Sequence, residues 1–86
     1  MSPFFDPPES ITVELTPLGK PRAFVWREQV HEVVTLANRW RNDEGWWREH
    51  GHIKREYFKL KTNTKHLVYI YHELPDGPWY IQSFDT

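Results

Sequence analysis

The residues with the most capacity for chemistry lie together between positions 39 and 48. This segment reads Arg-Trp-Arg-Asn-Asp-Glu-Gly-Trp-Trp-Arg and contains three tryptophans and three arginines. An exposed indole can stack on a nucleobase or anchor a partner peptide. An arginine can bind phosphate or lie over an aromatic ring. We therefore predict a binding site formed by two tryptophans and four arginines: Trp46, Trp47, Arg39, Arg41, Arg48 and Arg55.

A structural interpretation of the same segment is the alternative. Adjacent residues of an extended chain point to opposite sides, so Trp46 could cover the core while Trp47 stays exposed, or the reverse. Both indoles could instead close the mouth of a barrel. The arginines would then form solvated ion pairs with the acids of this region, and such pairs contribute little stability.

Other candidate sites have weaker support. His50-Gly51-His52 has the form of a partial metal site, but zinc normally needs three or four protein ligands. The chain has no cysteine, and its other histidines fall on separate predicted strands. The serines have no neighbouring His-Asp pattern typical of a nucleophile, and no glycine-rich phosphate loop is present. We expect a protein that is not an enzyme and holds no metal or cofactor.

Size and composition predict one small folded domain. A chain of 86 residues has room for a single core. Its mean hydropathy is -0.76, but five tryptophans, four tyrosines and five phenylalanines argue for folding, because disordered chains are poor in aromatics. The net charge is -1, whereas residues 39–61 hold seven basic and four acidic side chains, which permits one basic face. Neither a signal peptide nor a membrane-spanning run is present, so we expect a cytoplasmic protein.

Alternation of apolar and polar residues predicts β-strands along most of the chain. We expect a flexible lead-in over residues 1–10 and a single β domain over residues 11–86. The clearest strands are residues 11–16, 22–27, 55–61, 66–72 and 79–84. Turn signals lie at residues 17–21, 62–65 and 74–78, and a charged loop covers residues 42–54. We expect Phe58 and Leu60 to point inward.

Residues 29–41 fit either a helix or a strand. A helical stripe would consist of Val30, Val33, Val34 and Ala37. The valines and a threonine favour a strand. Both apolar faces of that strand would be used if it bends at a bulge near residues 33–34.

The pattern as a whole predicts an all-β fold. Five or six strands joined by short turns, with no convincing helix, indicate an antiparallel meander. A two-residue turn at residues 28–29 would place Trp26 opposite His31. The same register would place Phe24 opposite Val33. A flat sheet would expose one aromatic face, so we predict that the meander curls into a small, partly open, SH3-like barrel.

Four motifs resemble those of a bacterial domain family of unknown function. They are Pro21–Arg27, Arg39–Arg41 followed by Gly45–Arg48, Arg55–Phe58 and Gly77–Ile81. The resemblance covers residues 21–85. Members of that family occur alone or at the C-terminal end of some Y-family (translesion) DNA-polymerase-like proteins, and they usually have glycine where this chain has Glu28. The resemblance implies an association with DNA-damage tolerance, without a known activity.

These observations together predict a binding module linked to DNA repair or translesion replication. Its partner would be single-stranded nucleic acid or a protein, with no membrane contact. A protein-interaction domain or a purely structural accessory domain is the alternative. Tyr69, Tyr71 and Tyr80 would line a proline-peptide groove in an SH3-type barrel or contribute to the core with their hydroxyls at its rim.

Overall fold

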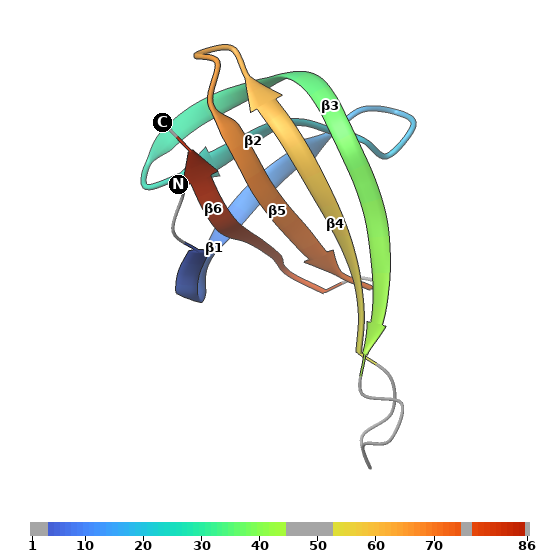
Figure 1. The fold of residues 1–86 in the computed structure, drawn as a ribbon. Coiled ribbons are helices and arrows are strands. Elements are labelled where there is room, and N and C mark those ends of the chain that lie inside the picture. Colours follow the sequence, from blue (N-terminus) through green and yellow to red (C-terminus); the bar gives the residue numbers. More distant parts are fainter. Residues whose placement is uncertain (1–3, 45–52, 75–76, 86) are drawn as a thin grey trace.

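The computed structural model describes residues 4–44, 53–74 and 77–85. In these residues the chain forms a closed antiparallel barrel in which each strand pairs with the next and β1 pairs with β6 (Figure 1). The strands are β1 (Phe4–Leu15), β2 (Pro21–Trp26), β3 (Gln29–Glu44), β4 (Ile53–Thr62), β5 (Leu67–Glu73) and β6 (Trp79–Asp85). The prediction of an all-β fold, with five or six antiparallel strands curled into a small barrel, is confirmed, and the barrel is closed rather than partly open.

Strand β1 begins at Phe4 rather than at residue 11. Phe4 and Glu9 both have partners in β6, so the part of the expected flexible lead-in that is described helps to close the barrel. The register shifts between these two residues, around the pair of prolines at positions 7 and 8. Proline cannot donate to a ladder hydrogen bond but is tolerated at such irregularities. Proline content alone was therefore a misleading sign of an unstructured segment.

Residues 29–41 form a strand, not a helix. They belong to β3, which pairs with β2 over Gln29–Glu32 and with β4 from Val33 onward. The register with β4 shifts between Val33 and Thr35, at the position where a bulge was predicted. Because a bulge bends a strand and increases its twist, β3 can pass from one side of the barrel to the other.

The turn between β2 and β3 is formed by Arg27 and Glu28, one residue earlier than predicted. Both residues have positive φ angles, 51° and 65°, as the tight hairpin turns between twisted strands require. Phe24 consequently lies opposite His31 rather than Val33. The predicted register was wrong by two residues, but side chains alternate with a period of two, so the predicted faces are unchanged.

The core fills the barrel interior. It is a cluster of seven buried apolar residues: Ile11, Phe24, Phe58, Leu60, Val68, Ile70 and Ile81. Phe58 and Leu60 are fully buried, as predicted. Burial of each large side chain contributes about 1.5–3 kcal/mol, and the half-buried rings of Trp26 and Trp79 pack against the same cluster.

Strands β3 and β4 form the longest pairing of the barrel. It runs from Val33 opposite Thr62 to Glu44 opposite Ile53, and it continues past the last pair of β4 with β5 as a two-stranded arm (Figure 1). Both ends of the loop predicted over residues 42–54 belong to strands instead, residues 42–44 to β3 and residues 53–54 to β4. This pairing carries most of the residues considered below.

Candidate binding surface

The structure divides the predicted site residues between two sides of the sheet. Three of them, Trp46, Trp47 and Arg48, lie outside the described residues. Arg39 lies opposite Phe58, and Arg41 lies opposite Glu56. Directly paired residues point to the same side of a sheet, so both arginines share the side of the core residue Phe58. Arg55 precedes Glu56 in β4 and points to the other side.

A buried carboxylate holds Arg39 and Arg41 together. Oε2 of Glu56 accepts hydrogen bonds from Nε and Nη2 of Arg39, at 3.0 and 2.8 Å, and from Nε of Arg41 at 3.0 Å. Glu56 is only 6% exposed. Its burial alone would raise its pKa, but the hydrogen bonds and charges of the two arginines lower the pKa below 4.5. This cluster carries two positive charges and one negative charge.

Aromatic packing surrounds this carboxylate at one end of the barrel interior. Glu56 lies opposite His72, whose ring stacks on that of Trp79 with centres 4.3 Å apart. Trp79 in turn lies 5.5 Å from Phe58, and the Arg39 guanidinium carbon lies 5.7 Å from the centre of the Phe58 ring. The arginines therefore stabilise the end of the core as well as the charge of Glu56.

The opposite side of the same strands carries a row of aromatic rings on the outside of the barrel. Trp40, Tyr57, Tyr71 and Tyr80 are successive cross-strand partners on β3, β4, β5 and β6. The ring centres are 5.4, 5.3 and 5.2 Å apart along the row. We call these four residues the aromatic row. Such spacing is typical of favourable aromatic pairs.

Arg55 lies over the middle of the aromatic row. Its guanidinium carbon is 5.0 Å from the centre of the Tyr71 ring, its side chain hydrogen-bonds to Tyr57, and its Nη2 lies 3.6 Å from Oε1 of Glu73. Burial raises the pKa of Tyr71 above 10.0. Tyr57 and Tyr71 are only 7% and 5% exposed, whereas the rings at the two ends of the row, Trp40 and Tyr80, are half-buried.

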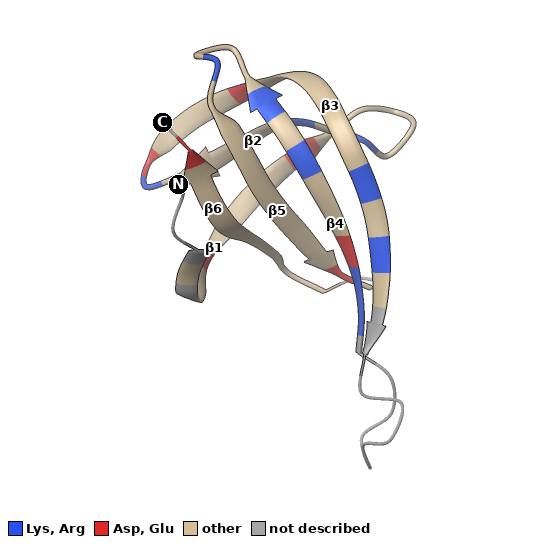
Figure 2. Cartoon of the chain, viewed as in Figure 1, with Lys and Arg blue, Asp and Glu red and all other residues tan. Residues whose placement is uncertain are grey.

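Lysines border the aromatic row on β4. Lys59 lies opposite Tyr69, with Nζ 5.8 Å from the centre of that ring, and the Tyr69 ring meets Trp40 edge-on at 6.3 Å. Lys61 follows on the same side and is exposed. Figure 2 shows how Lys and Arg gather on β3 and β4. We call Trp40, Tyr69 and Tyr80, together with Lys59 and Lys61, the aromatic–basic face.

The sequence did not indicate this face as a unit. Tyr71 is buried, as the structural interpretation predicted for some of the three tyrosines, whereas Tyr69 and Tyr80 are half-buried. All three lie on the side of β5 and β6 that is opposite the core residues Ile70 and Ile81. Their alternation with the buried residues Ile70 and Ile81 is the signal that could have placed them. The alternation of residues within a strand cannot reveal the register between β4 and β5, which aligns Tyr57 with Tyr71.

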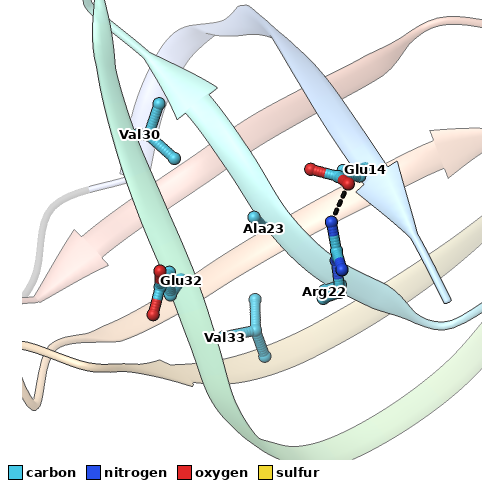
Figure 3. Close-up of a pocket in the computed structure, with 6 residues that line it drawn as sticks. All are labelled: Glu14, Arg22, Ala23, Val30, Glu32 and Val33. Carbon is cyan, nitrogen blue, oxygen red and sulfur yellow. Dashed lines mark hydrogen bonds and ion pairs between the residues drawn. The ribbon is translucent and has the colours of Figure 1, made fainter.

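A shallow pocket lies on another part of the surface, over β1, β2 and β3. It has a volume of about 400 Å³, and Figure 3 shows Ala23 at its floor with Glu14 and Arg22 paired on one side. The pocket exists because alanine leaves space between longer neighbours. Its acidic side chains, Glu14 and Glu32, are exposed, and Glu14 is engaged by Arg22.

The other end of the barrel interior contains a half-buried histidine, His31. The ring of His31 stacks on Phe24 at 5.1 Å and meets Phe84 edge-on at 5.3 Å. Its Nε2 atom is buried and has no hydrogen-bond partner within the described structure. Burial, with a smaller effect from the charge of His66, lowers the pKa of His31 below 6.5. The neutral ring behaves here as part of the aromatic packing.

Two classes of site can be assessed only for the described parts of the chain. Within residues 4–44, 53–74 and 77–85, no group of three or more histidine, aspartate or glutamate side chains could hold a metal ion. His50 and His52, considered above as ligands, lie outside these ranges. The same ranges contain no helix long and apolar enough to cross a membrane.

Comparison with known protein families identifies the family of this chain. Residues 7–85 match the family described as a domain of unknown function, DUF6504. The chain belongs to the DUF6504 family. The match extends the resemblance drawn from the motifs toward the N-terminus and includes most of β1, consistent with the role of that strand in closing this DUF6504 barrel. The chain matches no curated protein. It also matches no solved structure.

Proposed function

We propose that this DUF6504 domain is a non-enzymatic module that binds single-stranded nucleic acid on the aromatic–basic face. The observation that carries the proposal is the aromatic row on the outside of the barrel. The core lies on the other side of the same strands, so the barrel does not need these rings to fill its interior. Tyr57 and Tyr71 are buried in the middle of the row, and the half-buried rings at its ends, Trp40 and Tyr80, retain the surface that a ligand can contact.

The geometry suits stacking. The ring of Trp40 stacks on that of Tyr57, with the two planes only 5° apart. This contact orients the Trp40 ring in the absence of a ligand. Stacking of a base on an aromatic ring contributes about 1–3 kcal/mol. Trp40, Tyr69 and Tyr80 are each half-buried and so retain surface that a base can contact.

The lysines suit the sugar–phosphate chain that would run beside the bases. Lys59 and Lys61 lie on β4 next to the rings, on the same side of the sheet. Arg39 and Arg41 contribute less than the sequence suggested, because both are hydrogen-bonded to Glu56 on the other side of β3. An overall charge of -1 also favours local contacts over indiscriminate binding of polyanions.

The resemblance to domains found at the end of translesion-polymerase-like proteins of bacteria favours DNA as the ligand. Such polymerases act where single-stranded template is exposed. A small module that holds a single strand without reading its sequence would suit that setting, and a cytoplasmic location would follow. This part of the proposal is supported by the motifs rather than by the geometry.

The experiment is a titration of labelled oligothymidylate followed by fluorescence anisotropy at several salt concentrations. We expect binding that weakens as salt increases, because each phosphate contact to a single strand contributes about 0.7 to the slope of log K against log salt. The double variant Lys59→Gln/Lys61→Gln should bind more weakly and show a slope smaller by about 1.4.

A matched control removes the same charge elsewhere. Lys20 and Lys65 are exposed residues of turns, and Lys20→Gln/Lys65→Gln should bind like the wild type. Equal loss in both double variants would show that only net charge matters. Absence of binding at tens of micromolar protein in low salt would refute the proposal and leave a protein-interaction or structural role.

A further inference from the structure

One edge of β3 has no neighbouring strand within the described residues. Strand β2 pairs with β3 only over Gln29–Glu32, whereas β4 pairs with the other edge of β3 from Val33 to Glu44. The strand therefore extends past the end of β2, and the side that β2 would have covered is left open over Val34–Arg41. Figure 1 shows this part of β3 at the outer border of the sheet. We call it the open edge.

Most side chains on this part of β3 are exposed. Val34 is 64% exposed, Ala37 is exposed, and the register with β4 shifts at each of these positions. The backbone N–H of Arg39 donates to Oδ1 of Asn38 at 2.8 Å, so a side chain satisfies a donor that a neighbouring strand could take. Backbone groups along an open edge are a template for another strand.

The positive charge on the open edge favours an acidic strand as its partner. Residues 33–42 contain two arginines and no acidic residue, and the side chains of Arg39 and Arg41 are 43% and 67% exposed even though both contact Glu56. A strand added here would place alternate side chains about 5 Å from these arginines. Acidic side chains at those positions would form ion pairs, whereas a second copy of this edge would bring like charges together.

We propose that the open edge Val34–Arg41 binds an extended acidic segment of a partner protein by β-strand addition. Main-chain hydrogen bonds supply the affinity in this mode of recognition, and alternate side chains supply the specificity. The open edge includes the backbone of Trp40, but the charges that select the partner lie apart from the aromatic–basic face, because Arg39 and Arg41 point to the side of β3 opposite the Trp40 ring. The inference therefore does not depend on the proposed binding of nucleic acid.

The test uses the full chain and a synthetic peptide in which glutamate alternates with valine. Titration followed by two-dimensional NMR should shift and protect the backbone amides of residues 34–41. The same peptide with N-methyl groups on alternate backbone nitrogens keeps its charge but cannot complete the ladder, and it should not bind. A lysine–valine peptide should not bind either.

Two variants of the protein should change the affinity for the peptide in opposite directions. Arg41→Gln should weaken binding about two- to five-fold, the factor expected for an exposed ion pair. Glu56→Gln removes the competing carboxylate and should strengthen binding by a similar factor. Lys59→Gln/Lys61→Gln should leave peptide binding unchanged while it weakens binding of oligothymidylate, so the two proposals fail separately.

Three results would overturn the inference. Equal binding of the N-methylated peptide would show that charge alone acts. Equal binding of the lysine peptide would show that the arginines do not select the partner. Concentration-dependent protection of the amides of residues 34–41 in the protein alone would assign the open edge to a second copy of the chain.

Discussion

Trp40 and Tyr57 lie face to face on the outside of the barrel, with ring centres 5.4 Å apart and planes 5° from parallel. They are direct cross-strand partners, so the β3–β4 register fixes their contact. The next residue on each strand, Arg41 and Phe58, points to the other side of the sheet. One pairing thus supports the core on one side and a rigid aromatic surface on the other.

The first prediction concerns the stability that this contact provides. Trp40→Leu keeps an apolar side chain but removes the ring, and we expect the free energy of unfolding to fall by about 0.5–1.5 kcal/mol. Urea denaturation followed by circular dichroism measures the change. Leu18→Ala, at a site that is 83% exposed, should stay within about 0.5 kcal/mol of the wild type. An equally small effect at Trp40 would mean that the stacking is not a stabilising contact.

The second prediction concerns the turn between β2 and β3. Glu28 has a φ of 65°, a conformation that is unfavourable for a residue with a Cβ atom. Glu28→Gly should raise the free energy of unfolding by about 0.5–1 kcal/mol, because the relieved strain exceeds the added entropy of the unfolded chain. Glu32→Gly, in the middle of a strand, should lower it by about the same amount. Thermal unfolding of the two variants measures these changes in stability. Destabilisation by both substitutions would contradict the assigned turn.

The third prediction concerns Glu56 and acid. Its pKa in the folded protein lies below 4.5 because of Arg39 and Arg41. The carboxylate therefore stabilises the fold fully above pH 4.5, and that contribution is lost as the pH falls from there through the folded-state pKa. Glu56→Gln should lower stability near neutral pH by about 1–2 kcal/mol and should weaken the dependence on pH in the acid range.

The control for this prediction is an exposed glutamate. Glu32→Gln should keep the acid dependence of the wild type, since Glu32 is exposed on β3. Urea denaturation at a series of pH values gives both quantities. Identical pH profiles for Glu56→Gln and the wild type would show that the cluster does not hold the carboxylate in its charged form.

The fourth prediction concerns His31. Its pKa in the folded protein lies below 6.5, so at neutral pH the ring is uncharged in both the folded and the unfolded states. As the pH falls below 6.5, the unfolded state takes up a proton first, and stability decreases until the pH reaches the folded-state pKa. His31→Phe preserves the contacts with Phe24 and Phe84 without a titrating group. It should flatten the decline of stability that begins as the pH falls below 6.5; a profile as steep as that of the wild type would exclude His31 as the cause.

The fold was largely predictable because its strands show alternation of apolar and polar residues along the sequence. Phe24 and Trp26, or Phe58 and Leu60, reveal their common face through their spacing alone. The turn could not be placed correctly, because Arg27 and Glu28 have no sequence preference for positive φ and only the pairing of the strands imposes it. The role of residues 4–10 was hidden for a related reason, since the partners that order them lie in β6 at the far end of the sequence.

The candidate surface was only partly predictable. Composition drew attention to Arg39, Arg41 and Arg55, but it could not show that Arg39 and Arg41 converge on Glu56 while Arg55 covers Tyr71. Those contacts depend on the register between neighbouring strands. Trp46, Trp47 and Arg48 remain predicted binding residues outside the described parts of the chain.

The most direct measurement of the central proposal maps where a single strand of DNA touches the domain. Oligothymidylate is added to isotope-labelled protein, and the amide and aromatic signals are followed by NMR. Binding on the aromatic–basic face predicts saturable shifts at Trp40, Lys59, Lys61, Tyr69 and Tyr80. Shifts confined to the surface around Ala23 and Val30, or no saturable shifts at all, would contradict it.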